Sequence, residues 1–124
     1  MLKKLGVSPF RQVEDRLVML PGVIGIGEDG KLVNGPMAEL DQAYEHLKSL
    51  LLMGYGLTFN NIVRIRIYVV GLNRFSELVN NNYLKHFADV LAEHRVPPVR
   101  TVIGVTELPL GARFELEVDA DRGR

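Results

Sequence analysis

The stretch that decides the fold of this chain reads PPVRTVIGVTELPLGARFELEVDA and covers residues 97–120. Residues 99–106 and 112–120 are rich in β-branched and apolar side chains, which predicts two strands. Pro109 and Gly111 stand between them, where a tight turn needs residues of these types. We therefore expect the two strands to pair with each other as a β-hairpin.

Hydrophobic alternation predicts the register of this hairpin. The apolar residues that share one face of the second strand are Phe114, Leu116, Val118 and Ala120. The apolar rows of the two strands coincide in the register that places Arg100 on the same face as Glu115 and Glu117. Such a face is most often a solvated surface with weak cross-strand charge pairs. The alternative is a functional site with one guanidinium near two carboxylates.

Composition restricts the classes of function. The 124 residues suit one domain over residues 1–124. Lys plus Arg equals Asp plus Glu, 15 each, so the formal net charge is zero and no nucleic-acid partner is predicted. The absence of Cys excludes disulfides and thiolate catalysis. His46, His86 and His94 lack the spacing of a metal motif, so we expect no metal site.

No segment suggests export or a membrane. The basic start of the chain has no apolar run behind it, as a signal peptide would. The longest apolar run, residues 50–53, is far too short to span a bilayer. We expect a cytoplasmic protein without a membrane partner.

The first half of the chain predicts interrupted strand followed by helix. Residues 13–26 are strand-like but contain Pro21-Gly22, which predicts a bulge, an edge or a close backbone approach. Asn34-Gly35-Pro36 is typical of a helix start, and apolar residues at helical spacing continue to Gly54-Tyr55-Gly56, where we expect the helix to end.

The second half predicts a strand and a second helix before the hairpin. Residues 62–70 form the clearest strand of the sequence. Asn73 is the expected N-cap of a helix over residues 74–94, and Pro97-Pro98 ends it. Two amphipathic helices can cover only one face of the sheet. The predicted fold is α+β, with a mostly antiparallel sheet and two helices packed on one face.

The uncovered face is predicted to mix charged with apolar residues. Its members are Ile62, Arg64, Arg66, Tyr68, Arg100, Val102, Gly104, Glu115 and Glu117. We expect the arginines of the 62–70 strand to pair with acidic neighbours across the sheet. Asn80-Asn81-Asn82 is unusual in a helix interior, and it either forms an exposed polar face or meets a neighbouring subunit or the site.

One ordered set of residues resembles the C-terminal signature of the RidA (YjgF-type) family. The set is Pro98, Arg100, Thr101, Val105, Leu108, Pro109, Glu115, Glu117 and Ala120. The resemblance extends from about Ser8 to Ala120. It implies a chorismate-mutase-like homotrimer with active sites between subunits. It also implies hydrolysis of reactive 2-imino acids and their enamine tautomers, such as 2-aminoacrylate, to 2-keto acids and ammonia without a cofactor.

The same resemblance implies the site residues. Arg100 would bind the carboxylate of the substrate bidentately, as a guanidinium does well. Glu115, the first glutamate of the Glu-x-Glu pair, would orient a water molecule and transfer protons. The backbone of Val102 would accept a hydrogen bond from that water, and the backbone N–H of Gly22 would bind the carboxylate. The further expected substrate-binding residues are Phe10 and Asn80.

Two departures from the family pattern leave alternatives open. The usual Ser-Gly-Gln is Pro21-Gly22-Val23 here, and Phe10 stands where a Tyr is common. A protein of the same fold that binds a small carboxylate without catalysis is therefore one alternative. A related hydrolase that acts on another small acid is the other.

Overall fold

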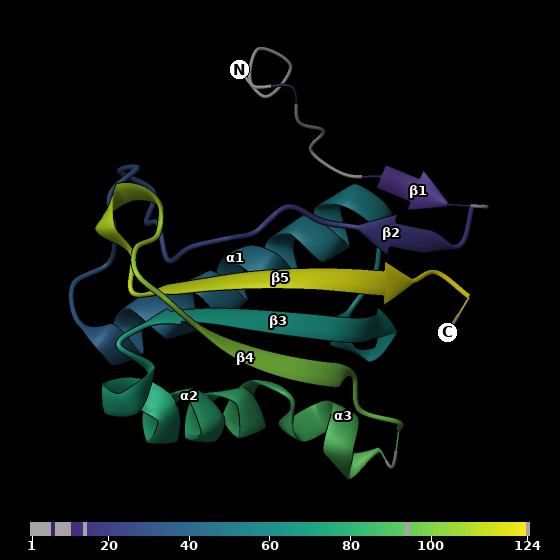
Figure 1. Cartoon of the computed structure of the whole chain (residues 1–124). Coiled ribbons are helices and arrows are strands. Elements are labelled where there is room, and N and C mark those ends of the chain that lie inside the picture. Colours follow the sequence, from purple (N-terminus) through teal and green to yellow (C-terminus); the bar gives the residue numbers. More distant parts are fainter. Residues whose placement is uncertain (1–5, 7–10, 14, 94, 124) are drawn as a thin grey trace.

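A single five-stranded sheet is covered on one face by helices. The computed structural model describes residues 6, 11–13, 15–93 and 95–123. Its strands are β1 (Arg11–Val13), β2 (Leu17–Met19), β3 (Ile62–Val70), β4 (Val99–Val105) and β5 (Phe114–Asp121), and its helices are α1 (Pro36–Tyr55), α2 (Leu72–His86) and α3 (Ala88–Ala92). Figure 1 shows α1 behind β5 and β3, with α2 alongside β4. The predicted α+β class is confirmed.

The strand order β1-β2-β5-β3-β4 corrects the predicted hairpin. The pairs β1–β2, β2–β5 and β5–β3 are antiparallel, so the sheet is mostly antiparallel as predicted, but β3–β4 is parallel. β3 therefore lies between β4 and β5, and the prediction that these two strands pair with each other was wrong. The helices α2 and α3 form the crossover that a parallel pair requires. The alternation of apolar residues shows which side chains share a face of a strand. It cannot show whether two successive strands pair with each other or both pair with a third strand between them.

The same topology separates residues that the hairpin register placed on one face. Arg100 is opposite Ile65, whose side chain is fully buried under the helices. Glu115 is opposite Tyr68, on the uncovered face of the sheet. Because Ile65 and Tyr68 are an odd number of residues apart in β3, they face opposite ways. The prediction that Arg100 shares a face with Glu115 and Glu117 was wrong.

The helix predictions are confirmed in part. α1 begins at Pro36 and ends at Tyr55 as expected, with Gly56 as its left-handed C-cap at φ 67°. The second helix is capped by Gly71, at φ 84°, and not by Asn73. The Gly71 carbonyl accepts the backbone N–H groups of Arg74 and Phe75. The helix also breaks at Phe87, so α2 and α3 replace one continuous helix, and the described residues form three α-helices instead of two.

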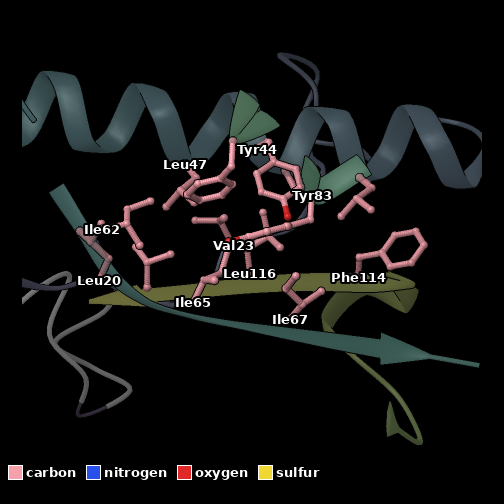
Figure 2. Close-up of a cluster of buried hydrophobic side chains, with 14 of the residues drawn as sticks. Leu20, Val23, Tyr44, Leu47, Ile62, Ile65, Ile67, Tyr83, Phe114 and Leu116 are labelled. Carbon is pink, nitrogen blue, oxygen red and sulfur yellow. The ribbon is translucent and has the colours of Figure 1, made fainter. Parts of the chain in front are cut away.

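The hydrophobic core lies between the sheet and α1 and α2. Figure 2 shows Leu47, Ile65, Ile67, Phe114 and Leu116 meeting there from α1, β3 and β5. Ile62 also faces this core and is 1% exposed, although strict alternation predicted it on the opposite face. A register irregularity between residues 62 and 64 explains the difference, because one extra residue in β3 moves the side chain before it to the opposite face of the sheet. Within the described part of the chain, no helix combines the length and apolar composition needed to cross a bilayer.

A buried carboxylate attaches α1 to the start of β5. Glu39 is fully buried, and its Oε2 accepts the backbone N–H groups of Arg113 (2.8 Å) and Phe114 (3.2 Å). Its Oε1 accepts a hydrogen bond from Arg113 Nη1 at 2.9 Å. Both oxygens are thus satisfied, which is the condition for keeping a charge in a protein interior.

We predict that Glu39→Gln lowers the free energy of unfolding by about 2–3 kcal/mol, since an amide nitrogen would then face the donors of residues 113 and 114. Urea titrations at a fixed protein concentration measure this loss. Glu45→Gln, on the exposed side of the same helix, is the control and should change stability by less than about 0.5 kcal/mol. Equal urea midpoints for the two variants would contradict the role of Glu39.

The hydroxyl of Tyr44 is buried without a hydrogen-bond partner among the described residues. Its ring is fully buried and stacks on His86, with 4.3 Å between the centroids. Burial, and to a lesser extent Tyr83, raises the pKa of Tyr44 well above its usual value, although Arg100 opposes this. An unpartnered hydroxyl in the interior costs stability.

We therefore predict that Tyr44→Phe leaves the free energy of unfolding unchanged or raises it by up to about 1 kcal/mol. Tyr68→Phe is the matched control, because the Tyr68 hydroxyl donates a hydrogen bond to Glu117 at 2.9 Å. That variant should lose about 1 kcal/mol. The measurement is the same urea titration, and a clear loss in Tyr44→Phe would show that its hydroxyl has a partner in solution.

Candidate functional site

Arg100 is held by two side chains of α2. Its Nη1 donates a hydrogen bond to Asn80 Oδ1 at 2.9 Å, and its guanidinium lies over the ring of Tyr83, 4.9 Å from the centroid. Asn80 and Tyr83 are three residues apart, so both project from one side of the helix. We call Arg100, Asn80, Tyr83 and Val102 the arginine cluster, since Val102 follows Arg100 on the same face of β4.

Tyr83 was predicted only as a core residue. Its spacing from Asn80 is the signal that could have associated it with the site, once Asn80 is placed there. Burial raises the pKa of Tyr83, and the charge of Arg100 offsets part of this effect. A cation over an aromatic face is attractive, and the ring also limits the orientations of the guanidinium. Most of the Arg100 donors are left for a ligand.

A second set of polar contacts fixes α2 against α1 behind this cluster. Asp41 Oδ1 accepts hydrogen bonds from Asn82 Nδ2 (2.9 Å) and Lys85 Nζ (3.1 Å), and His86 Nε2 lies 2.7 Å away. Burial alone would raise the pKa of Asp41, but the hydrogen bonds from His86, Asn82 and Lys85 outweigh it and lower the pKa. The asparagine run is thus divided, with Asn82 buried and Asn80 beside Arg100.

Ion pairs join β3 and β5 on the open face of the sheet. Glu117 Oε1 accepts hydrogen bonds from Arg66 Nη1 at 3.1 Å and from the Tyr68 hydroxyl at 2.9 Å. Asp119 lies 3.9 Å from Arg66 and 4.0 Å from Arg64. The prediction that the arginines of residues 62–70 pair with acidic neighbours is confirmed.

Glu115 differs from Glu117 although both project from the same face. Its carboxylate has no hydrogen bond or ion pair within the described residues. Burial raises the pKa of Glu115, and the negative charge of Glu117 raises it further. Gly22 packs directly on this carboxylate, because a Cβ at residue 22 would clash with Glu115 Oε2. The hydrogen bonds between Val23 and Leu116, at 2.8 and 2.9 Å, hold the two segments together. We call Glu115 and Gly22 the carboxylate cluster.

The structure thus brings the predicted site residues into two groups instead of one. Gly22 and Glu115 meet on the open face of the sheet, whereas Arg100, Asn80 and Val102 lie on the helix face, beyond β3. Phe10 lies outside the described residues. A small substrate cannot touch both clusters of one chain, because the sheet stands between them.

Neither cluster lines the cavity beside α3 on the helix side. That cavity has a volume of about 290 Å³ and lies between α1, α3 and the loop at residues 57–60. Tyr44, Phe59 and His86 are among its lining residues, but no member of the two clusters is. The described residues also contain no group of three or more His, Asp or Glu side chains placed to hold a metal ion.

Comparison with known proteins gives consistent results over nearly the whole chain. A sequence model of the family described as "Endoribonuclease L-PSP" matches residues 7–121. A RutC family protein of Aquifex aeolicus is 37% identical over 117 residues, covering 92% of this chain and 89% of the relative. The mouse protein named 2-iminobutanoate/2-iminopropanoate deaminase is 32% identical over 122 residues, with 94% and 84% covered.

A solved structure agrees with the computed fold. The Yersinia pestis protein YyfA, described as a member of the conserved Rid protein family, superposes with a TM-score of 0.79 at 29% identity. The superposition covers 93% of this chain and 86% of that protein. Together with the sequence match over residues 7–121, this shows that the chain belongs to the Endoribonuclease L-PSP family, which is the YjgF/RidA family.

Proposed function

We propose that this protein hydrolyses reactive 2-imino acids and their enamine tautomers to 2-keto acids and ammonia. The observation that carries the proposal is Arg100, which Asn80 and Tyr83 hold in place while most of its donors remain available for a carboxylate. The deaminase names of relatives about 30% identical support the reaction class.

The active site of the proposed enzyme forms between copies of the chain. The arginine and carboxylate clusters lie on opposite faces of one sheet, so a second copy must bring its carboxylate cluster to Arg100. The open face offers the surface for this contact, since it carries partly buried ion pairs and no helix of the described residues covers it. A ring of identical head-to-tail contacts would close as a homotrimer and would contain one such site at each interface.

Each cluster has one chemical task in this site. Arg100 binds the substrate carboxylate and fixes the imine carbon for attack by water. The backbone N–H of Gly22 and the carbonyl of Val102 help to position the carboxylate and the water. Glu115 moves protons between water and the imine nitrogen. Water adds to the carbon, the C–N bond breaks, and the products are a keto acid and ammonia. Asn80 and Phe10 complete the substrate contacts, and no metal or cofactor takes part.

A carboxylate-binding protein without catalysis is the second candidate. The observation that favours it is the segment beside Glu115, where Pro21-Gly22-Val23 supplies no side-chain donor or acceptor to a substrate. Arg100 would still bind a small acid in such a protein. Cleavage of RNA, which the family description mentions, receives no support from the charge of the chain, because its formal net charge is zero.

We predict that the purified protein releases ammonia from freshly generated 2-aminoacrylate faster than the spontaneous reaction does. Arg100→Lys should lower this rate by at least about tenfold, because an ammonium group cannot reproduce the guanidinium fork. Arg64→Lys, on the open face, is the matched control and should retain the rate. Binding of a small acid without any release of ammonia would favour the second candidate.

Mixing two inactive variants tests the shared site. Arg100→Ala and Glu115→Gln should each be inactive alone. The two variants are unfolded and refolded together as a one-to-one mixture. At each interface the arginine cluster is intact in about half of the cases and the carboxylate cluster, from the other chain, in about half, so about a quarter of the interfaces have both intact. We therefore expect about a quarter of the wild-type activity. A mixture as inactive as its components, despite a trimer mass by light scattering, would place the site within one chain.

A further inference from the structure

The hydroxyl of Tyr68 bonds to a residue that is not its direct neighbour across the sheet. Tyr68 lies opposite Glu115 in the β3–β5 register, yet its hydroxyl donates to Glu117 at 2.9 Å. The same oxygen of Glu117 accepts a hydrogen bond from Arg66, its own cross-strand partner, at 3.1 Å. Glu117 is therefore fixed by two donors, while Glu115, one pleat repeat away, has neither.

We propose that Glu117, fixed by Arg66 and Tyr68, is a positioning residue whose fixed negative charge keeps a proton on Glu115. Glu115 cannot move far from this charge, because its carboxylate packs on the backbone of Gly22, where a Cβ would clash with it. Two carboxylates on one face that do not share a donor are not both ionised readily. The charge of Glu117, held by its two donors, therefore opposes the ionisation of Glu115, which has none.

Other charged groups on this face do not change the assignment. Within one chain, the charged or titratable side chains that face Glu115 are Arg64, Arg66 and Tyr68 from β3 and Glu117 and Asp119 from β5, while the packing segment Leu20-Pro21-Gly22-Val23 contributes none. In the proposed assembly Arg100 of a second copy joins them, and the substrate carboxylate that it binds offsets its charge. Arg113, at the start of β5, is bound to Glu39. Arg64 and Arg66 are both within 4.0 Å of Asp119. Burial raises the pKa of Glu115 and the charge of Glu117 raises it further, which is the direction that the proposal requires.

This inference rests on the proposed function and adds the protonation state in which the reaction begins. Glu115 in its acid form donates its proton to the imine nitrogen, which makes the imine carbon more electrophilic. Water adds to that carbon and returns a proton to Glu115. The proton passes to the amino nitrogen, the C–N bond breaks as ammonia leaves, and the hydroxyl proton returns to Glu115. The cycle consumes one imino acid and one water, yields one keto acid and one ammonia, and ends with Glu115 protonated.

The test removes the charge of Glu117 and keeps its shape. Glu117→Gln retains an oxygen for Arg66 and Tyr68 but carries no negative charge. Carbon-13 NMR titration of the side-chain carboxyls, with the Glu115 signal assigned by its loss in Glu115→Gln, should show the pKa of Glu115 falling below its wild-type value. The acidic form then disappears at lower pH, so the high-pH limb of the imine-hydrolysis rate should move in the same direction.

Two further variants make the result decisive. Asp119→Asn removes a carboxylate from the same face of β5. Residue 119 is two residues farther from Glu115 than residue 117 is, so this variant should move the Glu115 titration much less than Glu117→Gln does. Arg66→Met removes the cation beside Glu117 and should move the titration to higher pH, and it provides the test if Glu117→Gln does not fold. An unchanged Glu115 titration in a folded Glu117→Gln, or an equal effect of Asp119→Asn, would overturn the proposal.

The titration and the rate separate this inference from the proposed function. NMR needs no substrate, so a Glu115 pKa that falls in Glu117→Gln supports the electrostatic role of Glu117 even if the wild-type protein hydrolyses no imine. The opposite result is a wild-type protein that hydrolyses imines, while Glu117→Gln leaves both the pH limb of the rate and the Glu115 titration unchanged. That result would support the deaminase activity and overturn the role of Glu117. The experiment therefore measures both quantities on the same three preparations, wild type, Glu117→Gln and Asp119→Asn.

Discussion

The buried carboxylate of Glu39 is the interaction on which the arrangement of helix and sheet depends. Its oxygens accept the backbone N–H groups at residues 113 and 114, so α1 sets where β5 begins. A Cβ on Gly25 would clash with the backbone of Glu39, so this segment also packs against the same turn of α1. Burying a charge is costly unless every oxygen is satisfied, and this contact therefore permits little freedom in the start of β5.

The placement of β5 next to β3 then decides the environment of both glutamates. Once Phe114 is fixed facing the core, the alternation of the strand turns Glu115 and Glu117 outward. Arg66 and Tyr68 of β3 reach Glu117, whereas Glu115 meets only the backbone of Gly22. Identical side chains two residues apart thus have different hydrogen-bond partners, and burial together with the charge of Glu117 raises the pKa of Glu115.

β3 also separates the two halves of the proposed site. It pairs with β4 on one edge and with β5 on the other, and this places Arg100 and Glu115 on opposite faces. Arg100 is supported by α2, which Asp41 fixes against α1, so the arginine cluster depends on helix packing. The carboxylate cluster depends on strand pairing alone. Each half is held by contacts within its own chain, and only a second copy can bring the halves together in the proposed enzyme.

Local patterns in the sequence were sufficient for the fold class, for the long first helix and for the central strand. The long helix from Pro36 and the strand at residues 62–70 follow from periodicity and capping, which depend on neighbours along the chain. Strand order did not follow, because the alternation of residues 99–106 fits either β3 or β5. Only packing selected β3 and moved Arg100 to the helix face. The difference between Glu115 and Glu117 was likewise invisible in their spacing, since it arises from Arg66, Tyr68 and Gly22, which long-range pairing brings beside them.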